Sequence, residues 1–203
     1  MKHLFFEGPM KEGKSTYIRQ LIKDKLNLCG GFASQRLLDE EGAIVGYRVV
    51  PAKEALEIER VYTPDLDNVF RLFKENCTVN APEVFYEGCM NYLRDQEGKQ
   101  FMLLDEIGGM ELLVPQFRKA LDEILGGGLP CIGVIKSHEN VRHMCRRSPD
   151  AERCIALNDA LHQEIKENFG GEIISFVRGE DYRCQVEAWL GQGEQGVTLK
   201  AEK

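Results

Sequence analysis

The stretch KHLFFEGPMKEGKST, residues 2–16, decides the fold that we expect for this chain. Residues 2–6 form a short apolar run typical of a buried strand, and the residues from Lys14 onward have the periodicity of a helix. Between them, Gly8 and Gly13 are separated by four residues, and Lys14 and Ser15 follow directly. This GxxxxGK[ST] spacing between a strand and a helix is the pattern of a phosphate-binding loop.

The chemistry of such a loop explains its residue types. Glycine adopts backbone conformations that other residues reach poorly, so successive N–H groups can turn inward and bind an anion at the start of a helix. Lys14 would reach the β- and γ-phosphates of a nucleotide, and the hydroxyl of Ser15 would bind Mg²⁺. The competing interpretation is a glycine-rich turn with a solvated lysine, and the flanking strand and helix weigh against it.

A second motif, FMLLDEIGGME at residues 101–111, supports the first. An apolar strand that ends in Asp105 is typical of a Walker B carboxylate, which lies near the Mg²⁺ of a phosphate-binding loop. Glu106 follows at once, and two adjacent carboxylates repel each other. A division of labour explains the pair: Asp105 faces the metal or its bound water, and Glu106 activates the attacking water. A solvated, acidic strand end is the competing interpretation.

The rest of the pattern predicts an α/β protein, because apolar strands alternate with helices of ten to fifteen residues, which indicates βαβ units and a largely parallel sheet. Strands are expected at residues 59–64, 100–106, 130–137 and 172–178, with a hairpin around DEEG at residues 31–51. Helices are expected at residues 14–28, closed by Gly30 and Gly31, and at residues 65–76, 81–95, 115–127, 157–169 and 183–191.

Composition places the chain among globular proteins. Of its 203 residues, 43% are hydrophobic and 29% are charged, which is ordinary for a soluble domain. The net charge of −7 provides no basic footprint, so nucleic acid is not an expected partner. No apolar run reaches the eighteen or so residues of a membrane span, and the seven cysteines include no CxxC pair. We expect a cytoplasmic protein with one domain at residues 1–190 and a mobile tail at residues 191–203.

The chain resembles the cancer-related nucleoside-triphosphatase family from residue 2 to about residue 177. The resemblance rests on GPMKEGKST, GFASQRLLDEEGAIVGYRVV, VNAPEVF, LLDEIGGMELLVPQFRKALDEIL and PCIGVIKS. The glycine loop is common to P-loop proteins in general. The DEIGxME block and the helix after it are the specific part of the match.

This resemblance implies a three-layer, RecA-like P-loop fold and Mg²⁺-dependent hydrolysis of ATP, GTP and other nucleoside triphosphates, with slow turnover and broad base tolerance. It implies that Lys14 and Glu106 are catalytic, with Glu106 as the base, and that Ser15 and Asp105 serve the Mg²⁺. The nucleotide-binding residues that it implies are Gly8, Pro9, Met10, Lys11, Glu12, Gly13, Lys14, Ser15, Thr16, Asp105, Glu106, Ile107, Gly108 and Gly109.

Several positions depart from the pattern of the family. Gly109 stands where family members usually have a lysine, which removes a positive charge. Gln35 and Arg36 replace the acidic residues of a GFxTEE-type stretch, and Lys11 and Glu12 stand where small residues are more common. Nucleotide binding is expected to survive these changes, which bear instead on turnover rate and base preference.

Hydrolysis also benefits from a second cation that neutralises charge in the transition state. A solvated surface charge is the ordinary interpretation for each of the candidates, which are Arg36, Arg118, Lys136 and the arginines at 142, 146, 147 and 153. The segment 136–153 is basic in an acidic chain, so it could close over phosphates or bind a partner. No common zinc-finger spacing relates its possible metal ligands, which are His138, His143, Cys145 and Cys154.

Two other functions would use the same loop. A small P-loop kinase would use residues 136–153 as an arginine-bearing lid. A carboxylate directly after Asp105 argues against a kinase, because it suits the activation of water, which a kinase must suppress. A nucleotide-dependent switch or RNA-associated module would use slow hydrolysis to reset a binding surface, and the acidic charge weighs against direct RNA binding.

Overall fold

A computed structural model of the chain describes residues 2–74, 77–146 and 148–198. The strands are β1 (His3–Glu7), β2 (Cys29–Leu38), β3 (Ile44–Pro51), β4 (Glu59–Val61), β5 (Val69–Lys74), β6 (Cys77–Asn80), β7 (Phe101–Ile107), β8 (Cys131–Ile135) and β9 (Gly171–Ser175). The α-helices are α1 (Lys14–Leu21), α2 (Pro82–Arg94), α3 (Pro115–Gly126), α4 (His138–Cys145), α5 (Ala151–Glu167) and α6 (Arg183–Thr198). Three short 3₁₀ helices complete the described elements: η1 (Lys23–Leu28), η2 (Ala52–Glu54) and η3 (Met110–Leu113).

All of these strands belong to one sheet, in the order β6-β5-β3-β2-β7-β8-β1-β9, and β4 pairs with β2 off this path. The run from β2 through β7, β8 and β1 to β9 is parallel. The pairs β2–β3, β3–β5 and β5–β6 are antiparallel. The structure therefore confirms the mostly parallel sheet and the β2–β3 hairpin that follows the first helix.

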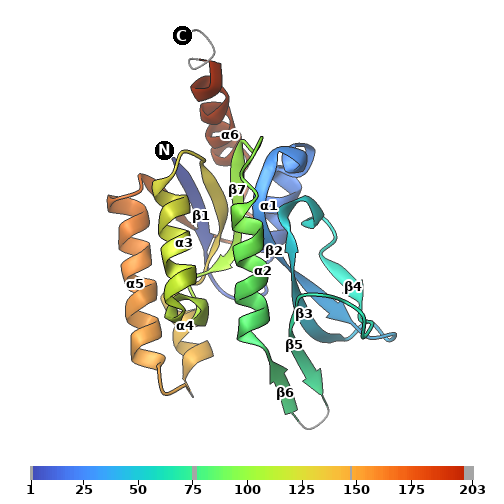
Figure 1. Cartoon of the computed structure of the whole chain (residues 1–203). Helices are drawn as coiled ribbons and strands as arrows, with labels where there is room; N and C mark the ends of the chain where they lie inside the picture. Colours follow the sequence, from blue (N-terminus) through green and yellow to red (C-terminus); the bar gives the residue numbers. More distant parts are fainter. Residues whose placement is uncertain (1, 75–76, 147, 199–203) are drawn as a thin grey trace.

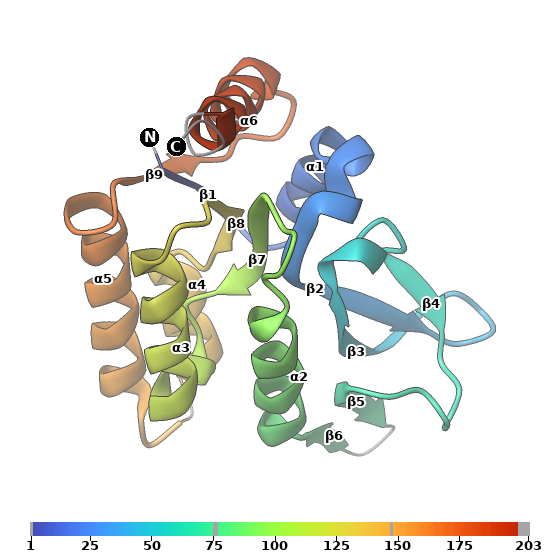
Figure 2. The same cartoon turned by 45° about the horizontal axis from the view of Figure 1, so that its top comes forward.

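Helices cover both faces of the parallel part of the sheet, as Figures 1 and 2 show. Neighbouring strand residues point to opposite faces, so Leu4 and Phe6 join one apolar core with residues of α1 and α6. Phe5 joins the second core, which contains residues of α2, α3 and α5. The three layers expected from the sequence are confirmed. No described helix is both long and apolar enough to span a membrane.

One predicted helix is wrong. The sequence pattern predicted a helix at residues 65–76, but β5 occupies Val69–Lys74, and residues 75–76 lie outside the described part of the chain. Strand pairing with β3 decides this segment. Phe70 packs against the core while Arg71 is exposed, so the segment follows the period of two of a half-buried strand.

Gly30 and Gly31 do not end a helix, contrary to the prediction. The first helix ends at Leu21, η1 follows, and both glycines lie within β2. Glycine is needed here because β7 lies close to the backbone of β2: a Cβ on Gly31 would lie 2.2 Å from the carbonyl oxygen of Leu103 on β7. At the other end of the chain, α6 reaches Thr198, beyond the predicted helix end at residue 191.

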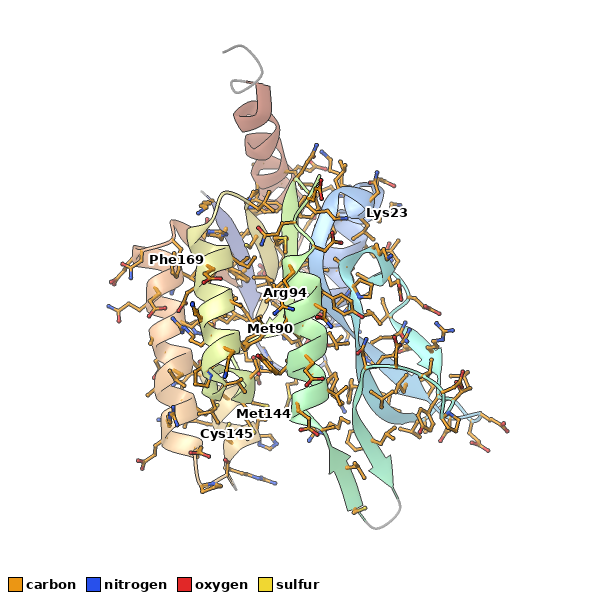
Figure 3. The ribbon with its side chains drawn as sticks, viewed as in Figure 1. Lys23, Met90, Arg94, Met144, Cys145 and Phe169 are labelled. Carbon is orange, nitrogen blue, oxygen red and sulfur yellow. The ribbon has the colours of Figure 1, made fainter. Side chains whose placement is uncertain are left out.

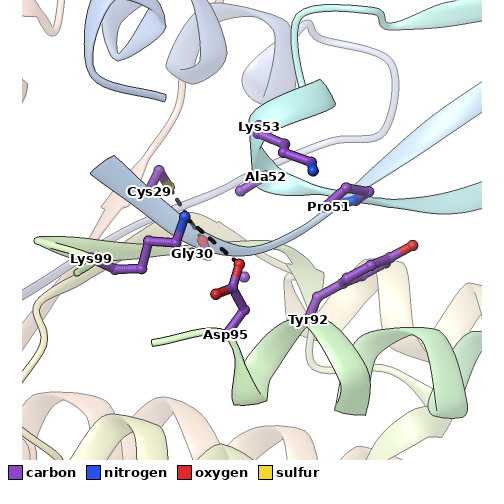
Figure 4. A pocket seen from close by; sticks show the side chains of 9 residues that line it. Cys29, Gly30, Pro51, Ala52, Lys53, Tyr92, Asp95 and Lys99 are labelled. Atoms are coloured by element: carbon purple, nitrogen blue, oxygen red, sulfur yellow. Dashed lines mark hydrogen bonds and ion pairs between the residues drawn. The ribbon is translucent and has the colours of Figure 1, made fainter. Parts of the chain in front are cut away.

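The carboxyl ends of β1, β7 and β8 share one edge of the sheet, because the three strands are parallel neighbours. In α/β proteins, ligands bind at this edge. A small pocket lies at the opposite edge, where β2 and β7 begin, and Figure 4 shows Cys29, Tyr92 and Lys99 around it. Its empty volume of about 210 Å³ includes open solvent and is below that of ordinary ligand sites. The two predicted motifs lie at the edge formed by the carboxyl ends of β1, β7 and β8.

Candidate active site

The predicted phosphate-binding loop connects β1 to α1. Gly8, Lys11 and Gly13 have positive φ angles of 142°, 65° and 88°, and the helix starts at Lys14 directly after Gly13. Such backbone conformations favour glycine, so Lys11 is the unusual residue of the loop. The loop exposes Pro9, Met10, Lys11 and Gly13, and leaves Glu12, Ser15 and Thr16 half-buried.

Lys14 folds back onto this loop. Its ammonium donates to the carbonyl oxygen of Gly8 at 2.9 Å and also to that of Pro9, and the residue is only 7% exposed. Burial lowers the pKa of Lys14, while Glu106, Glu12 and Asp105 oppose that shift through their negative charge. Both carboxylates of the DEIGG motif therefore act electrostatically on the lysine of the loop.

Asp105, two residues before the end of β7, is buried. Arg19 of α1 forms a buried ion pair with its Oδ2, and both side chains are 2% exposed. The backbone N–H of Ser34 donates to the same oxygen at 3.2 Å. Arg19 also donates to the carbonyl oxygens of Ser34 and Ala55, at 2.7 and 3.2 Å. The arginine thus ties β7 to β2 as it neutralises the carboxylate.

Glu106 differs from its neighbour in both exposure and backbone. The residue is exposed, and its φ of 62° lies in the left-handed region. The β7–β8 register shifts between Leu104 and Ile107, and such bulges re-aim side chains. Although its side chain reaches solvent, the protein around it displaces part of the surrounding water and raises the pKa of Glu106. The nearby charge of Asp105 raises it further, while Lys136 and Lys14 oppose the shift. A raised pKa suits a carboxylate that accepts a proton near neutral pH.

The residues after Glu106 are held by α5. Ile107, Gly108 and Gly109 are buried. The side-chain amide of Asn158 donates to the carbonyl oxygens of Gly108 and Lys136, at 2.9 and 3.0 Å. Asn158 is 0% exposed, and its Oδ1 has no hydrogen-bond partner among the residues that the structure describes. This one side chain joins the end of β7 to the end of β8.

The basic segment at residues 136–153 contains α4 and the start of α5. Asn140 of α4 donates to the carbonyl oxygen of Gly8 at 2.9 Å, so this helix packs against the phosphate-binding loop. Figure 3 shows Met144 and Cys145 at the other end of α4. A Cβ on Gly109 would lie 3.0 Å from the Cε of Met144. The helix therefore approaches both predicted motifs.

Of the candidate cations, the structure brings Lys136 to Glu106. Arg36 forms a 2.8 Å ion pair with Glu59 on β4, and Arg118 of α3 pairs with Asp122 at 2.9 Å. Three further arginines are exposed at or near α4 and α5, namely Arg142, Arg146 and Arg153. Arg147 lies outside the described residues.

The described residues contain no group of three or more His, Cys, Asp or Glu side chains placed to bind a metal ion. The Sγ atoms of Cys145 and Cys154 lie 3.2 Å apart, while His138 instead contacts Asp159 at 2.7 Å. Mg²⁺ at nucleotide sites commonly has only one or two protein ligands, with water and phosphates as the others.

Sequence reasoning missed Arg19, Asn140 and Asn158. Arg19 offered a signal, because it follows Ile18 on the predicted helix, beside the apolar stripe, and a charge that is buried needs a partner. The two asparagines offered none, because an isolated asparagine in a polar segment is ordinary. Their contacts depend on how the loops of separate βα units meet.

The sequence is similar to those of known nucleoside-triphosphatases. The sequence model of a family described as NTPase matches residues 3–167. The nucleoside-triphosphatase THEP1 of Thermotoga maritima is 28% identical over 175 residues, covering 83% of this chain and 92% of the relative. THEP1 of Thermotoga sp. strain RQ2 is 27% identical over 175 residues, with the same coverage of both chains.

Solved structures agree on the fold. The crystal structure of THEP1 from Aquifex aeolicus superposes with a TM-score of 0.58 at 17% identity, covering 95% of this chain and 99% of the other. The solution structure of a human cancer-related nucleoside triphosphatase gives a TM-score of 0.55 at 17% identity, with both chains fully covered. Because the family match spans most of the sequence, the chain belongs to the NTPase family and is an enzyme that hydrolyses nucleoside triphosphates.

Proposed function

We propose that the chain hydrolyses nucleoside triphosphates to the diphosphate and phosphate in a Mg²⁺-dependent reaction, with Lys14 binding the phosphates and Glu106 activating water. One observation carries this proposal. Glu106 is exposed at the edge of the sheet where the carboxyl ends of β1 and β7 lie, and its negative charge favours the charged form of Lys14 at the start of α1. A cation for the phosphates and a base for the water are thus close to each other.

The two carboxylates suit different tasks because their surroundings differ. Asp105 accepts hydrogen bonds from Arg19 and Ser34, so its carboxylate is oriented by fixed donors. Glu106 is exposed and has a raised pKa, which suits proton transfer. In the proposed step, Glu106 takes a proton from water as the water oxygen bonds to the γ-phosphorus. The bond from that phosphorus to the diphosphate oxygen breaks.

Ser15 and Asp105 are the residues that would hold Mg²⁺ together with the phosphates. Ser15 lies in the first turn of α1 and is half-buried. Arg19 and Ser34 bind one oxygen of Asp105, and the negative charge of this carboxylate would help to hold the ion. The ion would supply charge neutralisation on the phosphates.

Slow turnover, broad base tolerance and a cytoplasmic location complete the proposal. The first two rest on the family resemblance, with ATP, GTP and other nucleoside triphosphates as the expected substrates. The location rests on the cysteines, because all seven are free and a reducing compartment keeps them so. Nucleic acid stays an unexpected partner for a chain with a net charge of −7.

Phosphate release from wild type, Lys14→Ala and Glu106→Gln, with Mg²⁺ and with EDTA, tests these roles. Lys14→Ala should lose tight triphosphate binding in a thermal-shift assay. Glu106→Gln should keep binding and lose phosphate release by about 10²–10⁴-fold, the usual weight of a general base. Glu123→Gln, on an exposed part of α3, is the control for loss of one carboxylate.

A Glu106→Gln protein that releases phosphate at the wild-type rate would remove the base assignment. Full activity in EDTA would remove the Mg²⁺ dependence. Transfer of labelled γ-phosphate to an added nucleoside or nucleotide, in place of release to water, would support the kinase alternative.

A further inference from the structure

The backbone of Glu106 has a conformation that needs external support. Its φ of 62° is rare for a residue with a Cβ, and only Lys11 and Asn68 share this feature among the described non-glycine residues. Such conformations persist where the surrounding structure determines them, and they gather at functional sites. At Glu106 the conformation sets the direction of a side chain that leaves an otherwise buried strand.

Lys136 supplies that support. Its ammonium donates directly to the carbonyl oxygen of Glu106, and it also lies 3.6 Å from the Oε1 of Glu111. Both backbone polar groups of Lys136 are hydrogen-bonded. Its N–H donates to the carbonyl oxygen of Ile107 at 2.8 Å, and its carbonyl oxygen accepts from the side-chain amide of Asn158 at 3.0 Å. The lysine therefore holds the bulge of β7 from a rigid position after β8.

Gly109 leaves the space in which this contact forms. A Cβ on Gly109 would lie 3.1 Å from the Cε of Lys136 and 2.6 Å from the Oε2 of Glu111. The N–H of Gly109 donates to the Oε1 of Glu111 at 2.6 Å. The absence of a side chain at residue 109 thus lets Lys136 and Glu111 meet beside the bulge.

The other cations near Glu106 are engaged elsewhere. Lys14 donates to the carbonyl oxygens of Gly8 and Pro9, and Arg19 is paired with Asp105. Among the charged side chains described, Lys136 is the one whose hydrogen bond to the Glu106 backbone is observed. A hydrogen bond from a charged donor is stronger than a neutral one.

We propose that Lys136 is a positioning residue for the reaction: its ammonium holds the Glu106 backbone in the left-handed conformation and so aims the carboxylate at the attacking water. This inference rests on the proposed role of Glu106. Lys136 then acts on the chemical step through Glu106 and contributes nothing to nucleotide binding.

The test uses Lys136→Met, which keeps the length of the aliphatic chain and removes the ammonium. The value of kcat should fall tenfold or more, while KM and the thermal shift with nucleotide stay at wild-type values. Lys136→Arg should recover a large part of kcat, because the guanidinium can donate to the same carbonyl oxygen. Lys119→Met, whose lysine is 80% exposed on α3, is the matched control and should behave as wild type.

A double-mutant cycle separates positioning from direct action. In a Glu106→Gln background the base is already lost, so adding Lys136→Met should lower kcat by less than twofold. A further tenfold loss in that background would mean that Lys136 acts on the phosphates themselves, which would overturn the proposal. Wild-type kcat for Lys136→Met, or a rise in KM without a fall in kcat, would also overturn it.

A wrong assignment of Glu106 as the base can be distinguished from a wrong role for Lys136. In that case the Glu106→Gln protein keeps wild-type activity, regardless of the kcat of Lys136→Met. If Lys136→Met does not fold, Lys136→Gln is assessed by the same criteria. A crystal structure of the folded variant gives a readout independent of activity: the φ of residue 106 should leave the left-handed region, and an unchanged φ would contradict the proposal.

Discussion

The sheet has two regions that share one strand but place their residues in very different surroundings. The first residues of β2, Cys29–Phe32, pair with β7 in the parallel region. Residues Phe32–Leu38 pair with β3 in the antiparallel region. In the parallel region, the ion pair of Arg19 and the backbone of Gly31 are enclosed by protein, whereas Arg36 of the antiparallel region is partly exposed and Gly42 faces solvent. The comparison shows that surroundings decide how much a given residue type contributes to stability.

The ion pair of Arg19 should give the largest effect. Arg19→Ala leaves Asp105 as a buried and uncompensated charge, so we expect the free energy of unfolding to fall by about 3–5 kcal/mol. Urea denaturation measures this loss. Adding Asp105→Asn to the variant should restore part of the stability, because the unpaired charge is then gone. A loss below about 1 kcal/mol for Arg19→Ala would remove the distinction between the two regions.

Two glycines with nearly equal φ angles form the next comparison. Gly31, in the parallel region, has a φ of 88°, and Gly42, in the β2–β3 turn, has a φ of 84°. An added Cβ would lie 2.2 Å from the Leu103 carbonyl oxygen at Gly31, but would meet nothing within 4 Å at Gly42. Gly42→Ala should cost about 1 kcal/mol from backbone strain alone. Gly31→Ala should cost about 3 kcal/mol, since overpacking adds to that strain. Equal losses in thermal unfolding would show that the close approach to β7 has no energetic weight.

His3, on β1 in the parallel region, should make stability depend on pH. It is 0% exposed, its Nδ1 accepts from the Cys131 N–H at 3.0 Å, and its Nε2 lies 2.9 Å from the Leu125 carbonyl oxygen. Burial lowers the pKa of His3 from 6.5 to about 4. As pH falls, the unfolded chain therefore takes up the proton first, and stability present above pH 6.5 is lost as pH falls toward 4.

Between pH 7.5 and 5 this single group should remove about 2 kcal/mol from the free energy of unfolding. Urea denaturation at the two pH values measures the difference. His3→Gln is the comparison variant: it should be less stable at pH 7.5, yet lose about 2 kcal/mol less than wild type on acidification. Identical pH slopes for the two proteins would rule out His3 as the source.

The smallest effect should come from Arg36, in the antiparallel region. Its ion pair with Glu59 has a distance of 2.8 Å, but the two side chains are 37% and 46% exposed. Arg36→Ala should therefore change the free energy of unfolding by less than about 1 kcal/mol. Raising the salt concentration should make that difference smaller still. A loss comparable to that of Arg19→Ala would show that exposure does not set the contribution of these pairs.

Much of the parallel region was predictable from the sequence, because its signals are local. A buried strand before GPMKEGKS and another before DEIGG are short apolar runs with distinct ends. The alternation of strands and helices along the chain, and a largely parallel sheet, follow from the βαβ pattern. The β2–β3 hairpin was predictable for the same reason, since DEEG stands between two strand-like runs, GFASQRLL and AIVGYRVV.

The antiparallel region was predicted less well. Residues 69–74 form β5 and not a helix, because the choice was made by a free strand edge on β3 that lies far away in the sequence. The contacts of Gln35 could not be predicted from the sequence either. Its side-chain oxygen accepts from Arg48 at 2.6 Å and its amide donates to Glu57 at 2.6 Å, so this departure from the family pattern is built into a buried network.

By itself, the sequence determined the fold class, the phosphate-binding loop and the carboxylate pair, since each depends on residues close together along the chain. Only the tertiary structure decided which cation contacts which of the two acidic residues, and through which atoms. Arg19 meets Asp105, and Lys136 meets the backbone of Glu106. These partners stand on separate elements, so their meeting depends on strand order and on the bulge in β7. Electrostatic and hydrogen-bond energies depend on distance in space, which spacing along the chain does not specify.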